Sequence, residues 1–269
     1  FRYSARTWEL SRRKSISPHD STGANLIVQV KNNKVMRVVP LENEAVNECW
    51  IADRDRFSYE ALNGDQRLTK PMLKQGGEWT EVDWQTALEY VANGLNQVKA
   101  QYGAGGIGAL VSPHSTLEEL YLAASLMRGL GSENIDHRLR HQDFSPSEGV
   151  RWLGMPIAAL SDLQSVLVVG SNLRKDHPLF AQRIRQSARA GCAVTAITSE
   201  ALLANEGAWA MPLRATVVAE PDEWAQALAD VAAAVAAEKG VATPFEGQST
   251  DNAKALAKAL LAGERKAIL

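Results

Sequence analysis

The N-terminal part of the chain alternates between apolar and polar residues. Residues 26–30 (LIVQV) and 35–39 (VMRVV) follow the period of two that is typical of half-buried β-strands. The intervening residues 31–34 (KNNK) hold two asparagines, which tolerate the positive φ angles of tight hairpin turns. The pattern predicts a β-hairpin, within a small β-rich domain that we place at residues 1–75.

Beyond residue 75 the apolar residues recur every three or four positions, as on one face of a helix. Asp83 can cap the first of these helices, and Gly103 can end it. We expect its apolar stripe to be buried; the stripe consists of Trp84, Leu88, Val91, Leu95 and Val98. Thr116 and Glu119 have the spacing of a capping box, which predicts a second helix that stops at residues 129–131.

Short apolar runs alternate with the helical segments. The predicted strands are residues 107–111, 166–169, 193–197 and 267–269, and further helices are predicted to start near Pro178, Pro221 and Asn252. Strands that alternate with helices form a parallel sheet covered on both faces. We therefore predict an α/β fold, in which residues 76–269 form a doubly wound, mainly parallel domain.

Composition narrows the functional classes. The chain has 269 residues, of which 45% are hydrophobic, so it can bury a large core. Its 29 Lys and Arg residues nearly balance its 31 Asp and Glu residues, which favours neither nucleic acid nor an anionic membrane as a partner. No apolar run approaches the roughly 20 residues that span a bilayer. Cys49 and Cys192 are the only cysteines, and we expect both to be buried thiols in a reducing cytoplasm.

Two glycine-containing segments are candidates for a phosphate site. Residues 103–108 precede a predicted strand, whereas phosphate loops follow one, so we interpret them as a turn. Gly170, Ser171 and Asn172 directly follow a predicted strand, where open α/β sheets bind ligands, but they offer one glycine in place of three. We favour a tight turn there, and we keep these three residues as candidates for a vestigial pocket.

The sequence contains no recognisable catalytic residue and no convincing metal site. His137 and His141 are four residues apart, as metal ligands on a helix can be, but no third ligand is suitably spaced. We favour a partner interface for residues 138–141, because hydrogen-bond donors are dense there. His114 and His177 each follow a predicted strand and are interpreted as ordinary polar residues. A Gly-x-Ser-x-Gly nucleophile elbow is absent from the sequence.

The segment SISPHDSTGAN at residues 15–25 places Ser17, Asp20 and Ala24 at a three-then-four spacing. In the order of its elements and in several local strings the chain resembles the molybdopterin oxidoreductase superfamily, whose small N-terminal domain has a Cys-x2-Cys-x3-Cys-x27-Cys motif. Aligned on that motif, these three residues and Ala52 occupy the four cysteine positions. That motif binds a 4Fe-4S cluster through thiolates, which Ser, Asp and Ala cannot supply. The resemblance implies a degenerate site without metal, and Cys49, three residues from the fourth position, does not restore it.

Longer strings resemble one branch of that superfamily, the large iron–sulfur subunits of respiratory complex I. They are residues 1–10 (FRYSARTWEL), 20–25 (DSTGAN), 50–51 (WI) with 56–59 (RFSY), 67–71 (RLTKP), 134–140 (NIDHRLR) and 170–174 (GSNLR). The resemblance implies that a ferredoxin-like region with 2Fe-2S and 4Fe-4S clusters precedes Phe1. It also implies that the α/β domain continues beyond Leu269, and that the present chain carries no cofactor.

The same resemblance implies a function and partners. The expected role is a redox-silent structural part that braces the cluster-bearing region and the neighbouring peripheral-arm subunits, on the cytoplasmic side of the inner membrane. The whole complex transfers electrons from NADH to quinone and translocates protons, while this chain alone is expected to be inactive. No nucleic acid and no direct membrane insertion are expected. The alternatives are a catalytic molybdopterin enzyme of the formate dehydrogenase or nitrate reductase type, with its pterin near Gly170, and a stand-alone nucleotide-binding domain.

A metal cluster contributes folding free energy, so its loss must be offset by packing. The residues that we expect to form this substitute core are Leu26, Val28, Val35, Trp50 and Phe57. Truncating Trp50 to alanine is then expected to cost about 3–5 kcal/mol.

Overall fold

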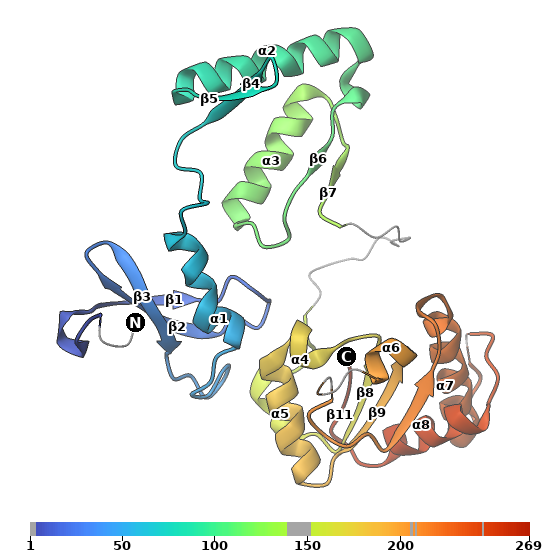
Figure 1. The fold of residues 1–269 in the computed structure, drawn as a ribbon. Helices are drawn as coiled ribbons and strands as arrows, with labels where there is room; N and C mark the ends of the chain where they lie inside the picture. The colour runs from blue at the N-terminus through green and yellow to red at the C-terminus, as the bar shows by residue number, and fades with distance from the viewer. Residues whose placement is uncertain (1–3, 139–151, 205–206, 208, 244) are drawn as a thin grey trace. The chain divides into compact units, whose positions relative to one another are not determined.

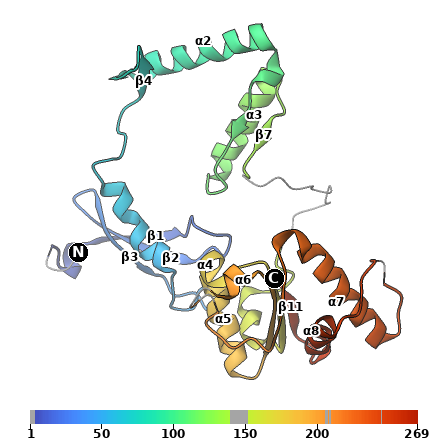
Figure 2. The ribbon, with the colours of Figure 1, turned by 45° about the vertical axis from the view of Figure 1, so that its right-hand side comes forward.

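The computed structural model describes residues 4–138, 152–204, 207, 209–243 and 245–269 (Figures 1 and 2). The chain falls into two compact units, one made of residues 1–59 with 151–269 and the other of residues 60–150. The N-terminal segment thus groups with the C-terminal half, and the division into domains at residue 75 stays a prediction. In the part of the chain that the structure describes, no helix combines the length and the apolar character that crossing a membrane requires.

A three-stranded antiparallel sheet forms the N-terminal part of the first unit. Its strands are β1 (Ser11–Ile16), β2 (Asn25–Lys31) and β3 (Lys34–Pro40), in the order β1-β2-β3, and the 3₁₀ helix η1 (Thr7–Glu9) precedes it. The predicted hairpin is confirmed, and Asn32 and Asn33 adopt the positive φ angles of 50° and 62° that its turn needs. Strand β1 was not predicted, because all its side chains are exposed and it has no apolar alternation.

The small core of this sheet differs from the expected one. Leu26, Val38 and Ile51 are buried, and Val28, Val35 and Tyr59 pack against them. Trp50 and Phe57 are 51% and 55% exposed, so the expectation that they form the substitute core is wrong. The buried Asn47 side chain donates a hydrogen bond to the Trp50 carbonyl oxygen (3.2 Å), which helps to hold the backbone in a path that buries Ile51 instead.

A four-stranded parallel sheet forms the rest of the first unit. Its order is β10 (Ala215–Val218), β9 (Ala193–Thr198), β8 (Ser165–Val169) and β11 (Lys266–Ile268), and each neighbouring pair is parallel. The predicted strands at residues 166–169, 193–197 and 267–269 are confirmed. The predicted α/β class is confirmed with them.

Helices cover both faces of the parallel sheet (Figure 1). Along β8, Val166 and Val168 face one layer while Leu167 faces the other, because successive side chains of a strand alternate. The first layer contains η4 (Ile157–Asp162) and α5 (Pro178–Arg189); the second contains α7 (Trp224–Lys239) and α8 (Asp251–Leu261). The shorter elements are α1 (Asp53–Phe57), η2 (Ser58–Asn63), α4 (Leu173–Asp176), α6 (Glu200–Leu203) and η5 (Pro221–Glu223).

In its described residues, 60–138, the second unit contains two α-helices and two small sheets. Its elements are β4 (Met72–Gln75), β5 (Glu78–Glu81), α2 (Trp84–Tyr102), η3 (Ala104–Gly106), β6 (Ala109–Leu110), α3 (Leu117–Leu130) and β7 (Ile135–Asp136). The predicted caps are confirmed: Asp83 accepts from the Thr86 amide, and Thr116 forms a capping box with Glu119.

The apolar stripe of α2 was expected to be buried, and that expectation is wrong for the described structure. Trp84 is 70% exposed, Leu88 is 62% exposed and Val91 is 50% exposed. Amphipathic periodicity fixes which face of a helix is apolar, but it does not supply the element that covers this face.

Candidate functional site

The four cluster-like positions lie around the start of α1. The connection between β1 and β2 folds back on itself, and the Ser17 amide donates to the Ala24 carbonyl oxygen (2.8 Å). Ser17 Oγ then donates to Asp55 Oδ1 of α1 (2.5 Å), and Ala52 is the residue that caps this helix. Ser17, Ala24 and Ala52 are all buried. The fold therefore brings the predicted positions to one region, as the spacing implied.

Asp20, the second of these positions, forms an ion pair. Its Oδ2 lies 2.5 Å from Nη2 of Arg54, and its Oδ1 accepts a hydrogen bond from the Thr22 amide (2.9 Å). Burial alone would raise the pKa of Asp20, but the hydrogen bonds from Arg54 and Thr22 outweigh it and hold the pKa below its usual value. The carboxylate is therefore charged and committed to a guanidinium.

Asp55 has the opposite electrostatic character. Burial raises its pKa, and the hydrogen bond from Ser17 offsets only part of this effect. Its residue exposure is 3%, and its Oδ2 has no hydrogen-bond partner among the described residues. The region thus holds one carboxylate that the fold stabilises in its charged form and one whose charge is costly.

The donor set does not fit an iron–sulfur cluster. A 4Fe-4S cluster requires four protein ligands, usually cysteine thiolates, and two of the four positions here are alanines without any donor atom. Cys49 is exposed, so the expectation that it is a buried apolar residue is wrong, and Cys192 is only partly buried. Among the described residues, no three His, Cys, Asp or Glu side chains are placed to share a metal ion. What these side chains can form is a fixed polar network.

The segment Gly170–Asn172 follows β8, where the sequence predicted a tight turn or a vestigial pocket. Gly170 has a φ of 62°, and a Cβ at this position would lie 2.1 Å from Cζ3 of Trp224. Ser171 Oγ donates to Asp176 Oδ2 (2.8 Å), while Asn172 Oδ1 caps α4 by accepting from the Lys175 amide (3.3 Å). Both polar side chains therefore have local partners, and the Trp224 indole lies directly against the glycine.

The remaining candidates are not gathered into this site. His137 and His114 are exposed, and His177 stacks on Phe180 with ring centroids 5.2 Å apart. His141 lies outside the described residues, as does most of the proposed interface at residues 138–141.

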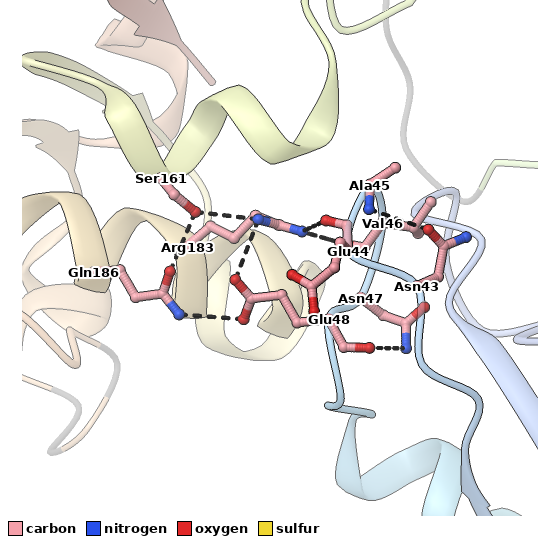
Figure 3. Close-up of polar contacts among 9 residues, drawn as sticks. All are labelled: Asn43, Glu44, Ala45, Val46, Asn47, Glu48, Ser161, Arg183 and Gln186. Atoms are coloured by element: carbon pink, nitrogen blue, oxygen red, sulfur yellow. Dashed lines mark hydrogen bonds and ion pairs between the residues drawn. The ribbon is translucent and has the colours of Figure 1, made fainter.

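Sequence reasoning missed two arginines that connect the two sheets of the first unit. Arg54 bonds to carbonyl oxygens after β8, and Arg183 of α5 bonds to the loop after β3 (Figure 3). Arg183 lies among the buried side chains of α5, at the same helical spacing as Phe180 and Ile184. A charged residue within an apolar stripe was the signal that could have identified it.

Comparisons with known proteins identify the same superfamily that the sequence resembles. Residues 67–219 match the profile of the molybdopterin oxidoreductase family, and residues 10–60 match that of the NADH-ubiquinone oxidoreductase NDSU1/NuoG-like 4Fe-4S domain. The chain is 34% identical over 192 residues to the G subunit of the NADH-quinone oxidoreductase of Rickettsia felis, covering 71% of this chain and 28% of the relative.

A second relative carries a different subunit name. The NADH-ubiquinone oxidoreductase 75 kDa subunit of Reclinomonas americana is 30% identical over 203 residues, covering 69% of this chain and 28% of the relative. The chain therefore spans 28% of the length of these curated relatives.

Proposed function

This chain belongs to the molybdopterin oxidoreductase family, and from that premise we propose that it is a redox-silent structural part of the G subunit of an NADH-quinone oxidoreductase. Its role is to brace the cluster-bearing region of that subunit and the neighbouring subunits. The complex as a whole passes electrons from NADH to quinone and translocates protons. The resemblance inferred from the sequence strings is confirmed by the family matches and by the named relatives.

The observation that carries this proposal is the chemistry of the four cluster-like positions. Residues 10–60 match the profile of an NDSU1/NuoG-like 4Fe-4S domain, yet Ser17, Asp20, Ala24 and Ala52 stand at the four cysteine positions of the cluster motif of the superfamily that the sequence resembles. Asp20 is engaged by Arg54 and Ser17 by Asp55, so the polar members of the set bond to protein groups. A carboxylate–guanidinium pair has no accessible redox chemistry, and we assign this region a structural role.

The surroundings of Gly170 support the same proposal. The Trp224 indole lies against the glycine at the carboxyl end of β8, where related open sheets bind their ligands. Its Nε1 donates to the Ala219 carbonyl oxygen (3.0 Å), which fixes the ring in this position. The arrangement disfavours the catalytic molybdopterin alternative, because a pterin at this place would have to displace the ring.

The proposal includes a location and partners. We assign the chain to the peripheral arm of the complex, on the cytoplasmic side of the membrane, in contact with other subunits of that arm. We assign it no nucleic acid partner, because positive and negative side chains nearly balance. We also assign it no direct membrane insertion, because its longest apolar runs are shorter than the roughly 20 residues that span a bilayer.

Metal analysis tests the proposal. Wild-type protein, reconstituted anaerobically with iron and sulfide, is compared with Asp20→Asn and with a variant carrying Ser17→Cys, Asp20→Cys, Ala24→Cys and Ala52→Cys. We expect identical iron content and electron paramagnetic resonance spectra for wild type and Asp20→Asn, and one additional 4Fe-4S signal in the four-cysteine variant.

Two results would contradict the proposal. One is a wild-type cluster signal that Asp20→Asn abolishes. The other is stoichiometric molybdenum in the purified protein that Gly170→Ala removes.

A further inference from the structure

The two sheets of the first unit have separate hydrophobic cores. The cluster of the N-terminal sheet contains Leu26, Val38 and Ile51, whereas the two clusters around the parallel sheet draw all their members from residues 153–269. No described residue belongs to both sets. The described apolar clusters therefore do not join these two parts, and the polar contacts between them must be considered.

Arg183 makes the most extensive of these contacts (Figure 3). Its Nη2 donates to the carbonyl oxygens of Glu44 (2.7 Å) and Val46 (3.1 Å), and its Nε donates to that of Val46 (3.3 Å). Its Nη1 donates to Glu48 Oε1 (3.3 Å) and to Ser161 Oγ (3.1 Å). The guanidinium is thus bonded on all three nitrogens to groups from both sides of the junction.

Both sides of this contact are held in place. Gln186 of α5 donates to Glu48 Oε2 (3.2 Å) and accepts from Ser161 Oγ (3.2 Å). On the loop side, Asn47 donates to the carbonyl oxygens of Leu41 and Glu48 (3.1 and 3.2 Å). Arg183 is 4% exposed, so water competes little for its donors and salt screens its ion pair weakly.

Arg54 bridges the two parts at a second place, beside the degenerate cluster positions. Its Nη2 binds the Asp20 carboxylate of the β1–β2 connection and also donates to the carbonyl oxygen of Asp176 (2.7 Å). Its Nη1 donates to the carbonyl oxygen of Lys175 (2.8 Å), and both carbonyl groups belong to the last two residues of α4. The fixed fork of an arginine can serve acceptors in several directions at once, which a lysine ammonium does less well.

We infer that Arg54 and Arg183 are positioning residues that fix the N-terminal sheet on the parallel sheet. Together with their acceptors they form what we call the polar junction. The inference goes beyond the proposed function, because it concerns how the chain holds its own two sheets and stands whether or not the chain belongs to a respiratory complex.

Distance measurements between spin labels test the inference. In a Cys49→Ser, Cys192→Ser background, labels are placed at the exposed positions Lys14→Cys on β1 and Arg189→Cys on α5. Arg183→Lys, Arg54→Gln and the double variant are compared with Arg185→Lys, an exposed arginine of the same helix. We expect the distance distribution to broaden in each junction variant, most in the double variant, and to stay unchanged in Arg185→Lys.

Hydrogen exchange supplies a second readout. Amide exchange at residues 43–48 is expected to rise about tenfold or more in Arg183→Lys, because these amides then open without unfolding either sheet. Exchange within β8 and β9 is expected to stay as in wild type. A double variant that keeps the wild-type distance distribution would overturn the inference, and so would an Arg183→Lys variant in which β8 and β9 lose protection together with residues 43–48.

Discussion

Ile51 and Trp50 are neighbours in the sequence, but only Ile51 belongs to the core of the N-terminal sheet. Ile51→Ala is expected to lower the free energy of unfolding by about 2–5 kcal/mol, because it leaves a cavity between β2 and β3. Trp50→Ala is expected to change it by only about 0.5 kcal/mol, since about half of the residue's surface is already exposed to water. Urea unfolding followed by circular dichroism measures both, and equal losses would contradict this assignment of the core.

The two buried carboxylates near the degenerate positions are expected to respond oppositely to substitution. The pKa of Asp20 is lowered in the fold, so its carboxylate charge stabilises the folded state. Asp20→Asn removes this charge and is expected to lower the free energy of unfolding by about 1.5–3 kcal/mol at pH 7. This stabilisation is fully present above the pKa of the unfolded state and is lost as the pH falls through the lower pKa of the folded state. The stability difference between wild type and Asp20→Asn is therefore expected to disappear in acid.

Asp55→Asn is expected to behave differently. The folded pKa of Asp55 is raised, so its ionisation destabilises the fold as the pH rises through that pKa, and stability is greatest in acid. An amide avoids this charge while still accepting from Ser17. We expect Asp55→Asn to lose no more than about 0.5 kcal/mol at pH 7, or to gain stability. Unfolding curves from pH 3 to 8 test both variants, and a loss in Asp55→Asn as large as in Asp20→Asn would refute the distinction.

For single residues, the sequence predicted which of them come together better than it predicted their burial and their bonding partners. The motif spacing identified Ser17, Asp20, Ala24 and Ala52 as a group, and the fold brings them together because backbone and side-chain bonds close the β1–β2 connection on α1. It could not show that Arg54 would engage Asp20, or that Cys49 would face solvent. Those outcomes depend on which residues become neighbours after folding.

Among the elements, the turn between β8 and α4 gives the sharpest prediction. The control is Gly240→Ala at the C-terminal end of α7, which is expected to lower the free energy of unfolding by about 1 kcal/mol. Its φ of 64° is unfavourable for alanine, but no atom lies within 4 Å of the new Cβ. Gly170→Ala has nearly the same φ and is expected to cost about 1–3 kcal/mol more, because its Cβ meets the Trp224 ring. Urea unfolding measures both.

A double variant separates the two contributions to the cost of Gly170→Ala, namely the steric clash with Trp224 and the backbone strain. Combining Gly170→Ala with Trp224→Ala is expected to remove most of the additional cost, giving a coupling free energy in a double-mutant cycle. Additive losses would show that the indole does not restrict this turn.

Elements whose signals are local were predictable. The caps at Asp83 and Thr116, the asparagine turn and the strand at residues 266–268 depend on residues close together in the chain. Strand β1 was missed because its membership of the sheet rests on pairing with β2 rather than on its own pattern. The exposure of α2 was missed for the related reason that a helical stripe does not identify its partner.

For the whole molecule, the separate cores of the N-terminal sheet and the parallel sheet imply that the unfolding of these two parts is coupled mainly through the polar junction. Removing Arg54 and Arg183 together is expected to separate the unfolding of the N-terminal sheet from that of the parallel sheet, because no shared apolar cluster of described residues couples them. Hydrogen exchange in increasing urea would then show two transitions in the double variant, at β1–β3 and at β8–β10. A single transition identical to that of wild type would contradict this expectation.

The fold class was the most predictable property at this scale. Alternating apolar runs and helical stripes indicate a parallel sheet because the helices that connect parallel strands cover both of its faces. The grouping of residues 1–59 with the C-terminal half was not predictable, since it depends on single arginines rather than on a pattern.

The pairing of Asp20 with Arg54 also bears on how the protein is made and damaged. A small domain that depends on a metal cluster is stably folded only when the metal is available, because the free energy of metal binding is part of its folding free energy. In the proposed structural role, Arg54 supplies the positive charge that pairs with Asp20, so we expect this region to fold without metal even when iron is scarce. We then also expect this region to be insensitive to damage by dioxygen or superoxide, which destroy exposed iron–sulfur clusters.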